Sequence, residues 1–457
     1  MRSSPQRLAT ALLFSALVCA FNPSRESAAQ APGPTIAEWP TTLRTDLRGS
    51  SLTVVLPENA PDRMWDDALI AKFAELTGIK VAVIRPGNDT TAALAKYLRD
   101  FRSGVPQGDV YAIDIVWPGI LSDYAEDLKP AFGGLPGVLP LLAKNDTVRG
   151  TLVAVPYFVE ISLLYYRKDL LERYHFEDPP RTWGELEEQS RRIQDGERAR
   201  GNAKFWGFLW QGAASEALTC NALEWQVSQD GGLLLKSDAA GNSIDLNRDR
   251  AVAILSRARG WVGTISPPEV TGQLEDDSLT LWKRGGAAFM RNWPYAYQES
   301  MGSDSSVAGL VGVTVLPAGD EAGAPHADTI GGFQLMVSKR SKNKPGAIEL
   351  IRFLTSPEIQ RVNAATRGYA PTIPELYGDP AVLKSNPFFA VLKQVLLESA
   401  VIRPSTVSGA RYDAVSRAYF TAVHKTLEGH ISASRGVEEI EVQLRRIMAK
   451  QSDFAAR

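Results

Sequence analysis

The chain has 457 residues, of which 44 % are hydrophobic and 22 % are charged, and its formal net charge is −2. A single hydrophobic core usually stops growing near about 250 to 300 residues, so this length predicts two or three domains of ordinary globular composition. The chain is close to neutral and carries no basic stripe, which excludes nucleic acid as a partner.

Residues 1–29 have the pattern of a signal peptide. MRSSPQR contains two arginines, and LATALLFSALVCAF follows as an uncharged, mainly apolar run of fourteen residues. This run is too short to span a bilayer, which takes about 20 apolar residues, but it fits the apolar region of an export signal. With cleavage after Ser27-Ala28-Ala29, we expect a periplasmic or extracellular protein with no integral membrane segment.

The chain contains two cysteines and four histidines. Cys19 lies in the leader, where lipid anchoring is an alternative that the large Val18 beside it disfavours. Cys220 is then the only cysteine of the exported chain, so we expect no intramolecular disulfide and a buried, inert thiol. The histidines have neither metal-ligand nor triad spacing, and we expect no metal, no cofactor and no histidine-centred catalysis.

From residue 51 the chain alternates strand and helix patterns. SLTVVL, IKVAVIR and DVYAIDIVW are rich in β-branched residues, and they are separated by the helical patterns MWDDALIAKFAELTG and TTAALAKYLRDFRSG. Three such units in sequence predict a parallel sheet that is covered on both faces. Open α/β sheets bind ligands beyond the carboxyl ends of their strands, where Glu58, Arg85 and Asp114 stand in this sequence.

Three later segments have unusual patterns. The run from 151 to 171 is longer than one ordinary strand and carries Glu160 within an apolar stretch, so we expect it to cross between two lobes. Residues 309–317 are a candidate for a second crossing. The strand pattern AAFMRN ends in Trp293-Pro294-Tyr295, where we expect a loop whose proline starts the next helix and leaves the aromatic rings facing a cleft.

The ordered motifs PYFVEISLLYYRKDLL, PPRTWGELEE, LWKRGGAAFMRNWPYAY, GVTVLP and GGFQLMVSK resemble the extracellular solute-binding proteins of ABC sugar importers (family 1). DIVWPG and LWQGAASEALTCNALEW resemble the trehalose/maltose-binding group of that family. The resemblance covers essentially the whole exported chain. It implies a two-lobed α/β fold of the type II periplasmic-binding class, in which each lobe is a mixed sheet flanked by helices and the lobes close about a hinge.

From the order of the elements, we expect a first lobe of residues 31–158 and 313–345. The second lobe is expected to contain residues 163–310 and 346–457. The hinge segments then lie near 159–162, 311–313 and 345.

The resemblance implies a binding protein rather than an enzyme. It would capture an α-linked disaccharide or short oligosaccharide, of trehalose or maltose type, and deliver it as a monomer to a two-subunit permease with a cytoplasmic ATPase. One alternative is a receptor of the same fold for another sugar, a polyol or a glycerophosphodiester. The cleft segments carry no basic cluster, which favours a neutral ligand. Another alternative is a secreted glycoside hydrolase that uses Asp114 and Glu160 as an acid/base pair, and the motif order disfavours it.

Sugar binding calls for carboxylates that accept hydrogen bonds from hydroxyls and aromatic rings that lie against C–H faces. By resemblance, Asp114, Glu160 and Arg403 match family ligands to sugar hydroxyls; alternatives are a helix cap for Asp114, a structural ion pair for Glu160 and ordinary surface duty for Arg403. Phe158 and Tyr157 either line the cleft or fill the core, and Trp117 is equally open. Gly332 would let a ligand approach the backbone. The predicted substrate-binding residues are Glu58, Arg85, Asp114, Phe158, Glu160, Trp293, Tyr295, Gly332, Phe333 and Arg403, with Trp293 preferred to Tyr295 as the residue beneath the sugar ring.

Overall fold

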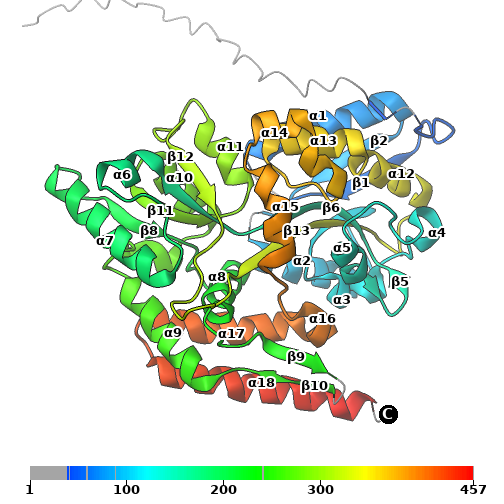
Figure 1. Cartoon of the computed structure of the whole chain (residues 1–457). Coiled ribbons are helices and arrows are strands. Elements are labelled where there is room, and N and C mark those ends of the chain that lie inside the picture. The colour runs from blue at the N-terminus through cyan, green and yellow to red at the C-terminus, as the bar shows by residue number, and fades with distance from the viewer. Residues whose placement is uncertain (1–38, 41, 58–59, 88, 239–240, 456–457) are drawn as a thin grey trace, which may run out of the picture.

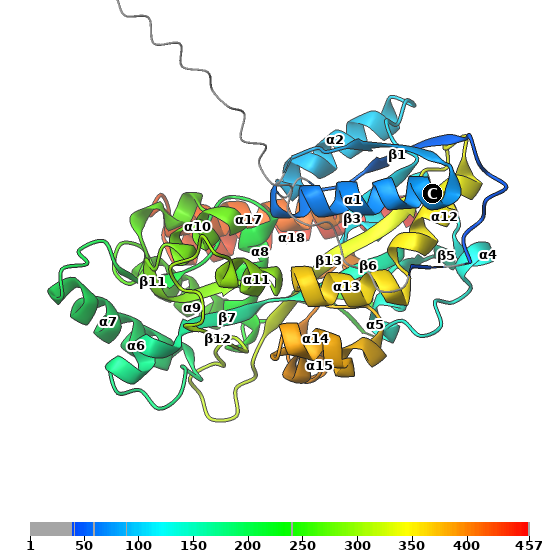
Figure 2. The ribbon, with the colours of Figure 1, turned by 90° about the horizontal axis from the view of Figure 1, so that it is seen from above.

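The structure is a computed structural model that describes residues 39–40, 42–57, 60–87, 89–238 and 241–455. Two α/β lobes lie side by side, each built on its own sheet (Figures 1 and 2). The predicted fold class is confirmed. The expected signal peptide, residues 1–29, lies outside the described residues, and so does Glu58. Within the described ranges, no helix is both long and apolar enough to cross a membrane.

The first lobe contains a six-stranded mixed sheet of order β14-β13-β3-β1-β2, with β6 also paired to β13. Strands β1, β2 and β3 run parallel to one another, as their alternation with helices predicts. The returning strand β13 is antiparallel to both β3 and β6, which makes the sheet mixed. The strands are β1 (Ser51–Val55), β2 (Lys80–Ile84), β3 (Val110–Asp114), β6 (Val155–Ile161), β13 (Asp328–Val337) and β14 (Ala400–Val401).

Helices pack against this sheet, whose strands β3 and β6 are buried along their whole length, whereas β2 at its edge is partly exposed. Asp89 caps one of these helices, α2, by accepting hydrogen bonds from Thr91 N and Ala92 N. The helices and short hairpin of this part of the chain are α1 (Ala60–Thr77), α2 (Thr90–Arg102), α3 (Pro118–Leu121), α4 (Lys129–Phe132), α5 (Pro140–Asn145), β4 (Thr147–Val148), β5 (Thr151–Leu152), α12 (Lys344–Leu354), α13 (Pro357–Arg367), α14 (Pro380–Ser385) and α15 (Phe389–Glu398).

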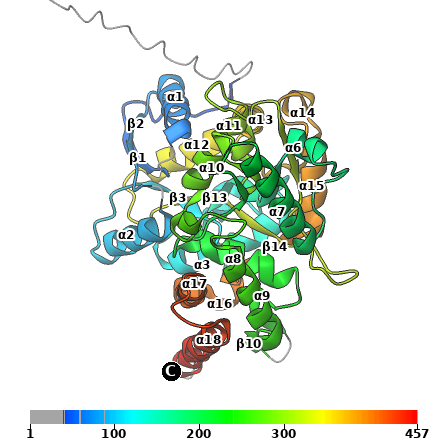
Figure 3. The same cartoon turned by 90° about the vertical axis from the view of Figure 1, so that its left-hand side faces the viewer.

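The second lobe contains a four-stranded sheet of order β12-β7-β11-β8. The C-terminal helix α17 packs against α8 and α9, and α18 packs against α17 and α9 at the bottom of the view in Figure 3. The elements are β7 (Leu163–Arg167), α6 (Lys168–Arg173), α7 (Trp183–Ala199), β8 (Trp206–Leu209), α8 (Glu216–Val227), β9 (Leu234–Asp238), β10 (Gly241–Asp245), α9 (Arg248–Trp261), α10 (Glu275–Lys283), β11 (Ala287–Asn292), α11 (Tyr295–Met301), β12 (Val311–Thr314), α16 (Ser405–Ser408), α17 (Tyr412–Leu427) and α18 (Ala433–Ala455).

The chain changes sheet at three places. Ser162 alone separates β6 of the first sheet from β7 of the second. The second change falls between Thr314 and Asp328, later than the expected 311–313, because β12 is paired with β7 over its whole length. The third follows β14 rather than residue 345, since β14 still pairs with β13 and the helices of the second lobe resume at α16.

Helix α12 explains why the expected boundary at 345 is wrong. Its apolar face, including Ala347 and Leu350, is buried in the same cluster as Val54 of β1 and Phe73 of α1. The helix therefore belongs to the first lobe, where its apolar stripe finds a complementary surface. The assignment of all of 346–457 to the second lobe fails for this reason.

Candidate ligand-binding cleft

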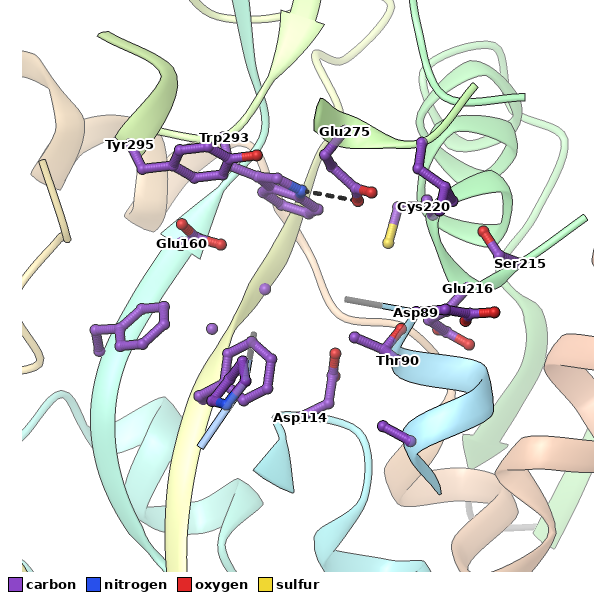
Figure 4. A pocket seen from close by; sticks show the side chains of 18 of the residues that line it. Asp89, Thr90, Asp114, Glu160, Ser215, Glu216, Cys220, Glu275, Trp293 and Tyr295 are labelled. Atoms are coloured by element: carbon purple, nitrogen blue, oxygen red, sulfur yellow. Dashed lines mark hydrogen bonds between the residues drawn. The ribbon is translucent and has the colours of Figure 1, made fainter. Parts of the chain in front are cut away.

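A cavity of about 320 Å³ lies between the two lobes. The first lobe supplies the end of β3, the middle of β6 and the Gly331–Gly332 segment of β13. The second lobe supplies the amino-terminal ends of α8 and α10 and the loop that follows β11. Figure 4 shows side chains from these elements converging on one space. Its volume is at the lower end of the range for small-molecule sites.

Most of the predicted binding residues meet at this cavity. Arg85 does not line it, because its guanidinium is turned to Asp67 Oδ1 at 2.7 Å and Asp66 Oδ2 at 3.5 Å. Tyr157 and Trp117, for which the core was the alternative, line the cavity as well. The predicted residues in the lining are Asp114, Phe158, Glu160, Trp293, Tyr295, Gly332, Phe333 and Arg403.

Arg403 is 2 % exposed and joins two carboxylates that come from different lobes. Its Nη1 donates to Glu216 Oε1 at 2.7 Å, and its Nη2 donates to Asp114 Oδ1 at 3.2 Å. Glu216 also accepts from Ser416 Oγ at 2.6 Å and from the Tyr412 hydroxyl. Burial raises the pKa of Glu216, and the charge of Arg403 offsets part of this rise. The cluster is a buried, hydrogen-bonded network that crosses the cleft.

Asp114 does not act as the helix cap that was the alternative to a binding role. Its Oδ1 accepts from Val116 N at 3.1 Å, a local turn, whereas Trp117 precedes the first residue of α3 and makes no side-chain cap. The same oxygen accepts from Arg403, so the turn and the ion pair share Oδ1. In Figure 4 the Asp114 side chain points into the cavity.

The Trp293 indole is held on several sides. Its Nε1 donates to Glu275 Oε1 at 3.3 Å, and the guanidinium carbon of Arg291 lies 4.0 Å from its ring centroid. The backbone of Gly331 approaches the ring so closely that an added Cβ would lie 3.1 Å from it. Burial raises the pKa of Glu275, while the indole N–H counteracts this. Trp293 is therefore oriented by its surroundings before any ligand arrives.

The first lobe contributes a second aromatic wall. Phe158 stacks on Tyr369 with ring centroids 4.0 Å apart, and Phe333 lies 5.6 Å from Phe158. Arg367 covers the Tyr369 ring at 4.1 Å and donates to Asp66 Oδ1 at 2.9 Å. Tyr369, Arg367 and Asp66 all line the cavity. Aromatic rings therefore stand at both sides of the space.

Several lining residues escaped the sequence analysis. Glu216 and Glu275 begin α8 and α10. An acidic residue is common at a helix amino terminus because it complements the helix dipole, so nothing in the sequence sets these two apart.

Cys220 also lines the cavity, and its burial confirms the prediction of a buried thiol; burial raises its pKa to about 12. A pKa this high favours the expected inert thiol, because little thiolate forms near neutral pH.

Carboxylates outnumber cationic groups in the lining. Such a surface accepts hydrogen bonds and repels anions. Among the described residues, no group of three or more His, Cys, Asp or Glu side chains has the arrangement of a metal site. The lining carboxylates are Asp66, Asp89, Asp114, Glu160, Glu216, Glu275, Asp276 and Asp277, and the lining guanidinium groups are Arg367 and Arg403.

Two lobes joined by crossing segments, with a polar and aromatic cavity between them, define a binding protein that closes on a small molecule. The chain belongs to the bacterial extracellular solute-binding protein family, whose profile matches residues 59–361. The family consists of substrate-binding proteins of ABC transporters, not of enzymes, so the hydrolase alternative is not retained.

Individual relatives support this family assignment. A probable ABC transporter-binding protein of Deinococcus radiodurans is 40 % identical over 83 % of this chain and 89 % of its own length. The maltose-bound structure of T. maritima MalE3 is 32 % identical, with a TM-score of 0.81 over 87 % of this chain and 100 % of that one. A galactooligosaccharide-binding protein of Bacillus subtilis is 24 % identical over 77 % of this chain and 79 % of its own.

Proposed function

We propose that this protein captures an α-linked disaccharide or short oligosaccharide, of maltose or trehalose type, and delivers it to the membrane permease of an ABC importer. The observation that carries the proposal is the meeting of carboxylates and aromatic rings from both lobes at one cavity. Carboxylates accept hydrogen bonds from hydroxyls, and aromatic rings pack against the C–H faces of sugars. The similarity to maltose-bound MalE3 supports the same class of ligand.

The charge of the cavity favours a neutral sugar over a glycerophosphodiester. Both guanidinium groups of the lining are already engaged, Arg403 with Asp114 and Glu216, and Arg367 with Asp66. A phosphodiester would lie among several carboxylates, and the charges of both guanidinium groups in the described lining are already balanced by carboxylates. A neutral, hydroxyl-rich ligand avoids this repulsion, so we do not favour a glycerophosphodiester.

Closure would couple the ligand to the importer. Thr91, in the first turn of α2, accepts a hydrogen bond from Glu216 N of α8 at 3.3 Å, so the two lobes touch beside the cavity. A ligand that contacts both lobes stabilises the closed arrangement by its differential affinity for that state. The permease, with two membrane subunits and a cytoplasmic ATPase, would recognise this closed form of a monomeric, exported protein.

The test is calorimetric titration of the mature protein with maltose, trehalose, sucrose, palatinose, glucose and ribitol, with glycerophosphocholine as the anionic comparison. We expect a disaccharide to bind most tightly. At a hundredfold excess over its Kd, that sugar should raise the free energy of unfolding by about 2.7 kcal/mol. Binding of ribitol or glucose more tightly than of every disaccharide would overturn the proposal, as would no binding at all.

A separate experiment addresses export. Expression of the full chain in a Gram-negative host should yield a periplasmic protein whose first residue is Gln30. A chain that stays in the cytoplasm with Met1 intact would contradict the expected signal peptide.

A further inference from the structure

Two buried polar atoms in the cleft lack a hydrogen-bond partner in the described part of the chain. They are Oγ of Ser215 and Nε of Arg403. Both residues line the cavity, and they are 6 % and 2 % exposed. Buried polar groups are nearly always paired, so an unpaired one in a binding cleft calls for a partner that arrives with the ligand.

Ser215 holds an unusual position for an unpaired serine. It directly precedes the first residue of α8, where a serine hydroxyl normally accepts a hydrogen bond from an amide of the first turn. Ser215 makes no such bond. The hydroxyl is therefore left unpaired at the positive end of the helix dipole, in a residue that lines the cavity, and Ala217 of the first turn lines it too. Figure 4 shows Ser215 beside Glu216 and Cys220 at the cavity.

Arg403 presents its remaining donor in a defined direction. Its two terminal nitrogens are committed to Glu216, Asp114 and the Ile330 carbonyl oxygen, at 2.7, 3.2 and 3.2 Å. Because the guanidinium is planar, these bonds hold the Nε–H in place. Nε can only donate, so its partner must be an acceptor.

The carboxylates beside Arg403 limit which kind of acceptor can bind its Nε. Asp114 and Glu216 both line the cavity and both bond to Arg403, so an anionic oxygen beside Arg403 would meet two carboxylates at close range. A hydroxyl accepts from Arg403 Nε and still has a hydrogen to donate to a carboxylate such as Asp114. An ether oxygen or a C–H group offers only part of this pattern.

We propose that one hydroxyl of the ligand accepts hydrogen bonds from Arg403 Nε and Ser215 Oγ at the amino terminus of α8, and that Ser215 thereby selects ligands that carry this hydroxyl. The inference rests on the proposed sugar ligand. It adds that Ser215 is a specificity-determining residue, which binds one hydroxyl and not the sugar ring as a whole.

The experiment combines a protein variant with ligand variants. Wild-type protein and Ser215→Ala are titrated calorimetrically with the disaccharide that binds best and with its monodeoxy analogues. Ser215→Ala should weaken the parent sugar about tenfold, which corresponds to about 1.4 kcal/mol. One monodeoxy analogue, which lacks the selected hydroxyl, should bind the wild-type protein more weakly than the parent sugar does. The same analogue should bind Ser215→Ala and the wild-type protein with equal affinity.

Ser190→Ala is the matched control. Its hydroxyl is also buried and unpaired, but it lies on α7 and outside the cavity lining. This variant should bind the sugar as the wild type does. Because Ser215 forms no helix cap, Ser215→Ala should keep the melting temperature of the wild type, and a thermal melt verifies this.

The outcomes distinguish the two proposals. If no sugar binds the wild type, the proposed function fails and this inference falls with it. If the wild type binds a sugar and Ser215→Ala binds it equally well, only the role of Ser215 is overturned. That role is also overturned if every deoxy analogue loses affinity equally in both proteins.

Discussion

The guanidinium of Arg291 lies over the indole of Trp293, with its central carbon 4.0 Å from the ring centroid. Arg291 is itself fixed by Glu224, to which its Nε donates at 3.0 Å, and by Thr329 at 3.1 Å. A cation on one side of the ring leaves the rest of the indole for the cavity that Trp293 lines. The ring is thus a preformed platform supported from behind by a buried ion pair.

Trp293→Ala should weaken sugar binding about thirtyfold, which corresponds to about 2 kcal/mol for the loss of a buried aromatic anchor. Calorimetry with the preferred sugar measures the effect. Trp206→Ala is the control, because Trp206 also lies under an arginine, Arg198 at 4.4 Å, but outside the cavity lining. A folded Trp293→Ala protein with wild-type affinity would refute the platform.

Glu160→Gln should weaken binding about tenfold, because a charged acceptor makes a hydrogen bond roughly twice as strong as a neutral one. Glu160 is 7 % exposed and lines the cavity. The control is Glu349→Gln, since Glu349 is 3 % exposed in α12, accepts from Arg44 N at 2.8 Å and does not line the cavity. Equal affinities of the two variants would argue against a ligand contact at Glu160.

Arg85→Ala should change the Kd by less than about twofold and lower the free energy of unfolding by about 1 to 3 kcal/mol. The side chain of Arg85 is 7 % exposed and bonds to Asp67, Asp66 and the Pro57 carbonyl oxygen instead of facing the cavity. Asp66 keeps its bond to Arg367 in this variant. Calorimetry measures the Kd, and urea unfolding measures the free energy of unfolding. A tenfold loss of affinity would show that Arg85 contributes to ligand binding after all.

Asp328 should make stability depend on pH. Burial is the main cause that raises its pKa, to a net value of about 8 in the folded protein; hydrogen bonds from Leu316 and Ser399 oppose the rise, and the charges of Glu224 and Arg291 have smaller, opposite effects. Its Oδ1 accepts from Leu316 N at 2.9 Å where the chain passes between the sheets. The folded state then retains a proton that the unfolded state has lost, so the contribution is complete below about pH 4 and declines up to about pH 8.

Asp328→Asn removes this titration. The free energy of unfolding, measured in urea at pH 5 and pH 8, should fall less between these values in the variant than in the wild type. Comparing the two proteins cancels the contribution of Asp146, whose pKa burial also raises. An identical decline in both would show that Asp328 does not titrate as stated.

Much of the fold could be predicted from short patterns. The first three strands and the helices between them follow from β-branched runs and helical spacing, and they are parallel as expected. The boundary at 345 could not be predicted, because the amphipathic pattern of α12 shows that one face is buried but not against which sheet. The two later crossings depend on pairing between β12 and β7 and between β14 and β13, which strand patterns do not reveal.

The cavity residues also divide into those that the sequence marks and those that only the folded structure reveals. Asp114 and Glu160 interrupt apolar strands, a local anomaly that marks them in the sequence. Glu216 has no such mark, yet it shares Arg403 with Asp114 across separations of 187 and 289 positions. Local order therefore predicted the strands, the helices and the carboxylates that break apolar runs. Only the tertiary structure decided which helix joins which lobe and which charges meet in the cleft, because those contacts depend on packing between segments that lie far apart in the chain.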